Sequence, residues 1–400
     1  MAIKMKRHST IIMAFGAVSF LIFLAFSKFS ESGAFNQQLP DNENLVQTPK
    51  KKIILMWTTV FGLQSGTLDD CPLKNQCEFT YDKSLLHSAN AIVFHASDAY
   101  QVQHFPSPTS PNQKFVFLSM ETPENLQAQG VFGKFQKNFF HWTMTHVSSS
   151  NVHFPYGGYW VPHQIAKERG FPLLDLSYDP IKLFEGKEIK GIFWLVSNCV
   201  TPDRREKAIE DLSKYIRVDI AGKCAQNETM KNYCPRGSNC HDIYRKYYFI
   251  FVAENSICND YITEKYWDRF MLPVIPIVMR KRIYERKIPP KSYIAMDEFS
   301  NPKAMADYLN FLMNNKNAYL EYFKWRNEGW TKAPWNTEGY RIGNLCCYSL
   351  HKVLGYCNLC DHLLRPDAEK PVPTIPDIGE WYIEQSACEK DDFVKQWTGA

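Results

Sequence analysis

The residues most suited to chemistry lie in one short stretch, FVAENSICNDYITEKYW (251–267). Polar side chains follow an apolar run there; they include Glu254, Asn255, Tyr261, Glu264 and Lys265. A lysine can meet phosphate, and a carboxylate can meet a sugar hydroxyl or an electron-poor centre, so this group suits a nucleotide sugar. On spacing alone, a surface helix with an ordinary glutamate–lysine pair is the alternative.

The same stretch predicts a helix over 261–271, with Asp260 as its N-cap. Apolar residues recur at i, i+4 and i+8 and would face a core: Ile262, Tyr266 and Phe270. Three polar residues would share another face of the first turn: Tyr261, Glu264 and Lys265. A helix N-terminus also attracts anions, which strengthens the interpretation as a phosphate site.

Short apolar runs bounded by polar or turn residues predict the buried strands that position this stretch. They fall into two series: 53–57, 91–95 and 115–120, then 191–196, 216–222, 247–254 and 274–279. Helix-compatible stretches lie between them, such as 203–215 and 301–314. Alternating strands and helices predict parallel sheets. Two series predict two α/β domains joined near Asp179 and Pro180.

Each series contains a strand that ends in an acidic residue. Glu121 follows the run at 115–120, and Glu254 with Asn255 ends the run at 247–254. Ligands of open α/β sheets bind beyond the carboxyl ends of the strands. The sequence therefore predicts a cleft between two domains, with one acidic strand end on each side.

The N-terminal region predicts a membrane anchor. Residues 9–27 carry no charge, and as a helix they would span about 28 Å, close to the thickness of a bilayer core. Basic residues before this run place that end in the cytosol and the rest in the lumen: Lys4, Lys6 and Arg7. A cleaved signal peptide is the alternative, but the run is long and no A-x-A site follows closely. We expect a cytosolic tail (1–8), an anchor (9–27) and a polar stem (28–50).

Composition and cysteine content agree with a lumenal globular protein. The chain is 45% hydrophobic, and its net charge of +4 indicates no particular partner. The basic cluster between Arg280 and Lys287 matches no nucleic-acid motif, so no nucleic-acid partner is expected. Twelve cysteines suit an oxidising compartment such as the lumen. Asn227 lies in the single N-glycosylation sequon of the chain, which is meaningful only if the chain is lumenal.

The stretch ENSxxxDYITEK (254–265) resembles the signature of the α1,3/4-fucosyltransferases. Further segments resemble that family in the same order: CPLKNQCEFTYDKS (71–84), LSMETPE (118–124), WTMTHVSSSNVHFPYG (142–157), WLVSNC (194–199) followed by Arg205, and CNLCDH (357–362). The resemblance covers roughly residues 52–362.

The resemblance implies a GT-B fold, in which two Rossmann-like domains face a central cleft. The domain over 51–180 would bind the acceptor, the domain over 181–345 would bind GDP-fucose, and a Cys-rich tail over 346–400 would pack back on the first. The implied reaction is inverting transfer of L-fucose from GDP-β-L-fucose to a GlcNAc hydroxyl of a glycoprotein or oligosaccharide glycan. The implied location is the Golgi membrane, as a single-pass type II protein with a lumenal catalytic domain.

The resemblance also implies roles for single residues. Glu121 matches the general base that deprotonates the attacking hydroxyl. Arg205 and Lys265 match cations that hold the diphosphate, and the remaining donor contacts would be Asn255, Tyr261 and Glu264. The chain contains no D-x-D triplet, so we expect no essential metal or other cofactor, with a divalent cation at most stimulatory.

The cysteines near the two ends of the resemblance would pair with one another: Cys71 and Cys77 with Cys357 and Cys360. The connectivity of the other eight cannot be deduced from the sequence. CxxC followed by Asp-His also allows half of a zinc site or a redox pair.

Several alternatives stay open. The acceptor is either the innermost GlcNAc of N-glycans or the GlcNAc of lactosamine-type antennae. Vertebrate members tend to carry Tyr-Arg-Arg-Asp-Ser-Asp where this chain has HVSSSN (146–151), which removes charges on the acceptor side. The linkage, α1,3 or α1,4, and the oligomeric state are also open. Other functions would be a lectin-like homologue without activity, or a lumenal thiol oxidoreductase that uses Cys357 and Cys360.

Overall fold

The computed structural model describes residues 50–399, apart from 70, 158–159, 236 and 333–349. These residues belong to one compact unit that begins at Pro49. The predicted cytosolic tail and anchor, most of the stem, and Cys346 and Cys347 lie outside the described residues. In the part of the chain that is described, no helix is both long and apolar enough to cross a membrane.

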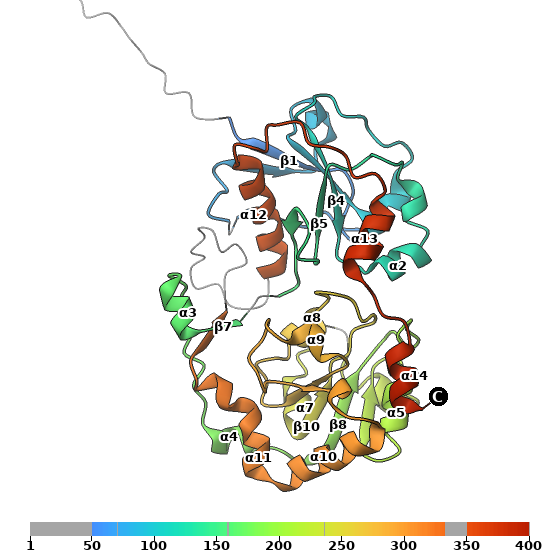
Figure 1. Ribbon diagram of the computed structural model, residues 1–400, viewed down its shortest axis with the longest axis vertical. Helices are drawn as coiled ribbons and strands as arrows, with labels where there is room; N and C mark the ends of the chain where they lie inside the picture. Colours follow the sequence, from blue (N-terminus) through green and yellow to red (C-terminus); the bar gives the residue numbers. More distant parts are fainter. Residues whose placement is uncertain (1–49, 70, 158–159, 236, 333–349, 400) are drawn as a thin grey trace, which may run out of the picture. The chain divides into compact units, whose positions relative to one another are not determined.

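Six parallel strands form the first sheet, in the order β2-β1-β3-β4-β5-β6 (Figure 1). Their bounds are β1 Lys52–Met56, β2 Cys77–Thr80, β3 Ala91–His95, β4 Lys114–Ser119, β5 Trp142–Thr145 and β6 Val152–His153. Ile92 pairs with Leu55 on one side and Phe115 on the other. Alternate side chains enter two separate cores, so Leu55 and Phe115 face one core while Ile54 and Val116 face the other. Because both faces are buried, the inner strands β1, β3 and β4 appear in the sequence as continuous apolar runs.

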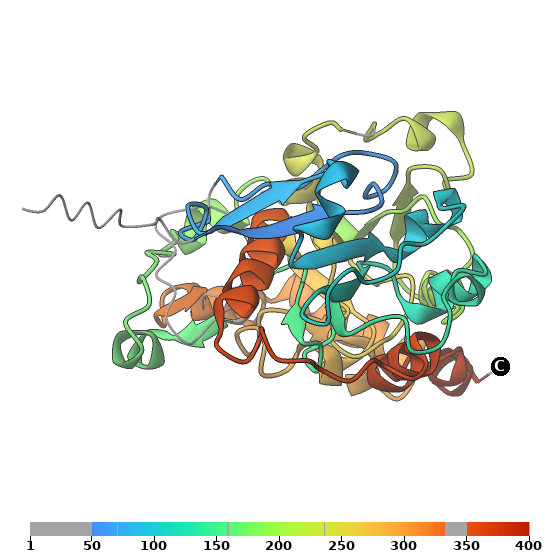
Figure 2. The ribbon, with the colours of Figure 1, turned by 90° about the horizontal axis from the view of Figure 1, so that it is seen from above.

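Helices from the C-terminal part of the chain cover both faces of this sheet (Figures 1 and 2). The helix α12 (Leu350–Leu364) contributes Tyr356, Leu359 and Leu363 to one core. The other core contains residues of α2 (Pro123–Ala128) and α13 (Ile378–Ser386). Two disulfide bonds, Cys71–Cys357 and Cys77–Cys360, fasten α12 to the segment around β2.

Five parallel strands form the second sheet, in the order β12-β11-β10-β8-β9. Their bounds are β8 Ile189–Leu195, β9 Val218–Ala221, β10 Tyr247–Phe251, β11 Ile275–Val278 and β12 Ile294–Ala295. A short antiparallel pair joins β7 (Trp160–Pro162) to β13 (Trp330–Lys332). The other helices are α3 His163–Glu168, α4 Pro180–Phe184, α5 Arg205–Leu212, α6 Glu228–Lys231, α7 His241–Lys246, α8 Glu264–Trp267, α9 Lys281–Tyr284, α10 Pro302–Asn314, α11 Lys316–Leu320 and α14 Asp392–Thr398. The 3-10 turns are η1 Lys83–His87, η2 Ala96–Gln101, η3 Phe132–Lys134, η4 Met296–Glu298 and η5 Glu321–Arg326.

The α/β class and the parallel strands predicted from the apolar runs are confirmed. The position of the last helix differs from the expectation that the whole Cys-rich tail (346–400) packs on the first domain. The last helix, α14, packs instead against α5 in the core of the second sheet. It does so because its apolar side chains are buried there: Phe393, Val394 and Trp397.

Candidate active site

Glu121 lies just beyond the carboxyl end of β4, where its backbone and side chain are both held. Its carbonyl oxygen accepts hydrogen bonds from the Ser119 hydroxyl at 2.8 Å and from the Tyr382 hydroxyl at 2.7 Å. The Asn125 amide, from the first turns of α2, donates to Glu121 Oε2 at 2.7 Å. The half-buried carboxylate is therefore oriented before any ligand arrives.

The helix predicted over 261–271 is wrong in extent and in its cap. The helix α8 covers only 264–267, and its N-cap is Thr263, whose hydroxyl accepts a hydrogen bond from Lys265 N at 3.3 Å. Asp260 has a positive φ of 62°, which is a left-handed conformation and not that of an N-cap. Tyr261 therefore lies in a loop and does not share a helical turn with Lys265.

Contacts from distant parts of the chain determine this loop. The Asp260 carboxylate accepts a hydrogen bond from Ser148 N at 2.8 Å and forms an ion pair with Lys287. The Glu254 carboxylate accepts hydrogen bonds from both Thr263 N at 2.6 Å and Thr263 Oγ1 at 2.7 Å. Asp260 is thus engaged elsewhere, and Thr263 begins the helix.

Lys265 lies between two carboxylates. Its Nζ is 3.2 Å from Glu254 Oε2 and 3.4 Å from Glu264 Oε1. Burial raises the pKa of Glu254, against the attraction of Lys265. Burial lowers the pKa of Lys265, but the two carboxylates outweigh burial, and the pKa is raised overall. The lysine therefore stays protonated in a fixed position, which is what an anion site needs.

Two tyrosines, Tyr261 buried and Tyr156 partly buried, lie where the two acidic strand ends approach each other. The rings of Tyr156 and Tyr261 are 6.0 Å apart, and the Tyr156 hydroxyl donates to Met120 O. Burial raises the pKa of both phenols well above 10.0. The negative charges of three carboxylates raise these pKa values further: Glu121, Glu254 and Glu264. Carboxylates that follow β4 and β10 thus act on the same pair of side chains.

The loop after β4 also touches the loop after β10 directly, because the Thr122 and Ser256 hydroxyls are 3.3 Å apart. The structure therefore brings Glu121, Tyr261, Glu264 and Lys265 into one region. A positioned carboxylate opposite a protonated lysine can deprotonate one reactant and stabilise an anion on another.

Arg205 and Asn255 lie around the same turn but differ in whether their side chains have hydrogen-bond partners in the structure. Arg205 is 2% exposed, and its guanidinium donates to Ala253 O at 2.6 Å and to Asn198 O at 3.0 Å. It supports the backbone just before Glu254, and its predicted contact with a diphosphate stays a prediction. Asn255 Oδ1 is buried and has no hydrogen-bond partner in the structure, so a ligand hydroxyl at this point would satisfy it.

Asp203, two residues before α5 begins, gives a test of pH dependence. Burial raises its pKa from 3.8 to about 6. Well below pH 3.8 the carboxyl is protonated in both the folded and the unfolded chain. Between about pH 4 and pH 6 the unfolded chain is ionised while the folded chain still holds its proton, so the folded chain loses stability as the pH rises. Between pH 5 and pH 7.5 this carboxyl should lower the unfolding free energy of the unmodified chain by about 1 kcal/mol. Asp203→Asn should lack this decrease, which is measured from the unfolding free energies of both proteins at the two pH values.

Asp211→Asn, on α5, is the control for that experiment. Burial opposes ionisation of Asp211, but Lys214 and Lys207 lower its pKa. Removal of this carboxylate should therefore lower the unfolding free energy at neutral pH, whereas Asp203→Asn should raise it. Equal pH profiles for Asp203→Asn and the unmodified chain would contradict the assignment.

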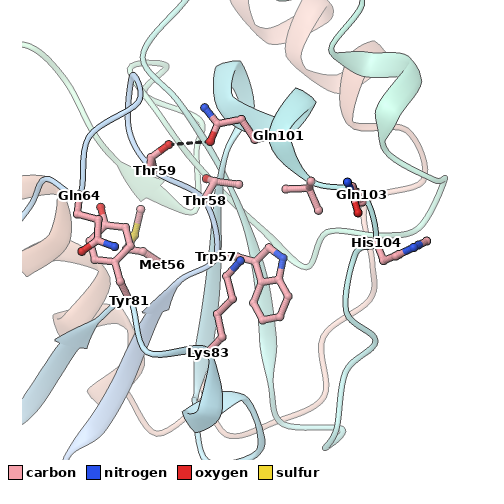
Figure 3. Close-up of a pocket in the computed structure, with 11 residues that line it drawn as sticks. Met56, Trp57, Thr58, Thr59, Gln64, Tyr81, Lys83, Gln101, Gln103 and His104 are labelled. Carbon is pink, nitrogen blue, oxygen red and sulfur yellow. Dashed lines mark hydrogen bonds between the residues drawn. The ribbon is translucent and has the colours of Figure 1, made fainter.

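A separate cavity of about 350 Å³ opens at the carboxyl end of β1 (Figure 3). Aromatic, amide and hydroxyl side chains line it, among them Trp57, Thr59, Gln64, Tyr81, Gln101, Gln103 and His104. Lys83 Nζ lies 4.7 Å from the centre of the Trp57 ring. The strand order places β1 two strands from β4 in a parallel sheet, so the cavity and Glu121 lie along the same edge. Such a lining suits a neutral polyhydroxylated ligand.

The disulfide bonds bear on two alternatives. Cys71–Cys357 and Cys77–Cys360 agree with the pairing that the resemblance implied. The cysteines of CxxC are thus bonded to distant partners and not to each other, which argues against a zinc site or a thiol oxidoreductase. The described residues contain three further bonds: Cys199–Cys224, Cys234–Cys240 and Cys258–Cys388.

One group of potential metal-ligand atoms occurs among the described residues: Glu124, Cys258 and Cys388. Its two sulfurs are bonded to each other, so they offer no thiolate. Whether a divalent cation stimulates activity stays a prediction. Asn227, the predicted glycosylation site, is exposed as the N-cap of α6, where its Oδ1 accepts from Met230 N at 2.8 Å.

Four residues of this region were not predicted as site residues. Glu254 was noted only as a strand end, and Tyr156 lay unnoticed in the segment 142–157. His146 and Tyr382 contact each other, with 3.2 Å between Nδ1 and the hydroxyl. Burial lowers the pKa of His146 to about 3, so its ring is neutral. A buried tyrosine far along the chain carries no local signal of such a contact.

Comparisons with known proteins agree with these observations. A family model described as "Fucosyltransferase, N-terminal" matches residues 49–157, and one described as "Glycosyltransferase family 10 (fucosyltransferase) C-term" matches residues 185–381. Alpha-(1,3)-fucosyltransferase fut-1 of Caenorhabditis elegans is 33% identical, over 86% of this chain and 71% of that protein. Alpha-(1,3)-fucosyltransferase C of Drosophila melanogaster is 28% identical, over 94% of this chain and 88% of that protein.

A crystal structure of an alpha1,3-fucosyltransferase is also similar, with 14% identity and a TM-score of 0.47. The similarity covers 86% of this chain and 97% of that one.

Proposed function

This chain belongs to glycosyltransferase family 10, the fucosyltransferases, and from that premise we propose that it transfers fucose from GDP-fucose to a glycan hydroxyl in α1,3 linkage. Relatives over most of the chain carry the name alpha-(1,3)-fucosyltransferase. The observation that carries the proposal is the meeting of two acidic strand ends. Thr122 after β4 contacts Ser256 after β10, and the charges of Glu121, Glu254 and Glu264 act on the same two tyrosines. Lys265 is paired with Glu254.

In this proposal Glu121 is the general base. It takes the proton of the acceptor hydroxyl while that oxygen bonds to the anomeric carbon of fucose. The bond from that carbon to the diphosphate breaks, and GDP leaves with the electron pair. Attack from the opposite face turns a β-linked donor into an α-linked product, as in other inverting transfers between carboxylates. Asn125 orients the base through its hydrogen bond to Oε2.

Lys265 takes the role of the cation beside the departing diphosphate. It is already protonated and held by Glu254 and Glu264, so little reorganisation accompanies the reaction. Glu264, the more exposed of the two carboxylates, faces the positive charge that develops on fucose. Arg205 adds a buried positive charge beneath the turn at Glu254 and Asn255. With these cations in place we expect no essential metal.

We place part of the acceptor glycan in the cavity beside Trp57 and Gln64. It lies along the sheet edge that carries Glu121, and its aromatic and amide lining suits sugar rings and hydroxyls. Gln64→Ala should raise the acceptor KM about tenfold and leave the GDP-fucose KM unchanged. Equal KM values for the acceptor in the variant and the unmodified chain would remove this cavity from the acceptor site.

The acceptor is proposed to be a glycoprotein glycan reached in the Golgi lumen. The decisive experiment incubates the purified chain with GDP-fucose and two acceptors, an N-glycan with its chitobiose core and a free lactosamine. Mass spectrometry then maps the products. One deoxyhexose on one acceptor would establish transfer and separate core from antenna. Binding of GDP-fucose with no transfer to either acceptor would favour the lectin-like alternative.

A further inference from the structure

The last residues of the chain extend beyond the part that the family model matches. That match ends at residue 381, whereas the structure describes the chain to residue 399. We refer to residues 382–398 as the C-terminal brace. The brace contains the end of α13, a short connection and α14, and it can be followed in Figure 1.

The middle of the brace is joined to the loop between Asn255 and Tyr261. The disulfide Cys258–Cys388 links them covalently. On the two sides of that bond, Asn259 N donates to Ser386 O at 2.7 Å, and Glu389 N donates to Ile257 O at 2.8 Å. Three consecutive loop residues, 257–259, are therefore held by the brace through covalent or backbone bonds.

The first residue of the brace reaches Glu121. The Tyr382 hydroxyl donates to Glu121 O at 2.7 Å, and the ring is fully buried against Phe117 of β4. The brace thus contacts the backbone of the proposed base at one end and the loop of the donor residues in its middle.

The remainder of the brace holds the second sheet. α14 packs against α5, the helix that begins at Arg205, and the Trp397 indole donates to Phe299 O at 3.0 Å. Glu389 forms ion pairs with Arg282 at 2.7 Å and with Arg280 at 3.1 Å, and both arginines lie in the basic cluster between Arg280 and Lys287. These contacts fix the brace on the same sheet that carries the loop.

We propose that the C-terminal brace is a positioning element for the transfer reaction, which holds the donor-side loop 255–261 in register with Glu121. The assignment of this role rests on the proposed function. The physical reason is that a loop with little regular structure samples many conformations unless it is tied down. A cross-link to a segment anchored on both strand ends removes most of that freedom before the donor binds, and misplacement of reacting groups is costly.

The test compares two pairs of cysteines in the full chain. Cys258→Ser with Cys388→Ser removes the tie to the brace. Cys234→Ser with Cys240→Ser removes a disulfide of the second sheet region that closes only a short surface segment. Hydrogen exchange and steady-state kinetics are measured for both double variants and the unmodified chain.

We expect the Cys258/Cys388 variant to lose exchange protection at the amides of Asn259 and Glu389. Its GDP-fucose KM should rise about tenfold while the acceptor KM stays within about twofold. The Cys234/Cys240 variant should keep both values. The proposal would be overturned if exchange protection in loop 255–261 were unchanged in the Cys258/Cys388 variant. It would also be overturned if the GDP-fucose KM and the acceptor KM rose by the same factors in both double variants.

Two further variants keep every disulfide, in case the Cys258/Cys388 variant does not fold. Tyr382→Phe removes only the hydroxyl that bonds Glu121 O, and it should lower kcat about fivefold without changing the GDP-fucose KM. Glu389→Gln weakens two ion pairs of the brace and should raise exchange at Asn259. If neither variant shows its change, the proposal is wrong.

The exchange measurements need no substrate, so they test the brace even if the chain transfers no fucose. Absence of transfer by the unmodified chain would instead contradict the proposed function. The two failures are therefore distinguishable.

Discussion

Glu121→Gln should lower kcat for fucose transfer about a thousandfold while GDP-fucose binding stays nearly unchanged. The glutamine amide keeps the size of the side chain, and its oxygen can still accept the hydrogen bond from Asn125. It cannot take a proton from the acceptor hydroxyl, so the loss should appear in the chemical step. Transfer rates give kcat, and calorimetry with GDP-fucose gives the dissociation constant.

The control for this variant is Glu78→Gln. Glu78 is an exposed carboxylate on the edge strand β2 of the same sheet, so the same charge is removed outside the site. It should transfer fucose at the rate of the unmodified chain. Normal turnover by Glu121→Gln would refute the base assignment, and loss of donor binding would point to a structural role instead.

Lys265→Ala should lower kcat/KM for GDP-fucose about a thousandfold, through both a higher donor KM and a lower kcat. The variant removes the cation nearest the proposed diphosphate. It also leaves the Glu254 and Glu264 carboxylates without the ammonium that lies 3.2 Å and 3.4 Å from them. Two unpaired carboxylates would repel the donor as well, so the effect should exceed that of a lost contact alone.

Lys281→Ala provides the comparison, because Lys281 is an exposed lysine of the second sheet region that is paired with Glu298 at 2.5 Å. It should leave both kinetic constants unchanged. Thermal unfolding of each variant separates a loss of stability from a loss of donor binding. A Lys265→Ala enzyme with the donor KM of the unmodified chain would show that another group holds the diphosphate.

From the sequence alone, seven of the thirteen strands among the described residues could be predicted, together with the α/β class. Most of these strands appeared as short, continuous apolar runs, such as 91–95, because inner strands of a parallel sheet are buried on both faces. Acidic residues at the carboxyl ends of two of those runs, one in each sheet, indicated the site, since ligands of open α/β sheets bind beyond those ends. The fucosyltransferase signature, which includes Glu264 and Lys265, added the expected chemistry.

The tertiary structure alone decided the local geometry around those residues. Asp260 is a good N-cap by type, yet its carboxylate is bound by Ser148 and Lys287. Thr263, which donates to Glu254, is instead the N-cap of the helix that begins at Glu264. Ser148 and Lys287 are far from Asp260 in the sequence, and their contacts take the carboxylate that would otherwise cap the helix. Local helix propensity holds no information about such contacts.

The same limit applies to the C-terminal brace. Cys258–Cys388 joins residues 130 positions apart, and Tyr382 reaches the carbonyl of Glu121 across 261 positions. A cysteine or tyrosine has the same local pattern whether or not such a partner exists. The sequence therefore determined which residues are present for chemistry, and only long-range packing decided how they are held, because that packing depends on contacts between segments far apart in the chain.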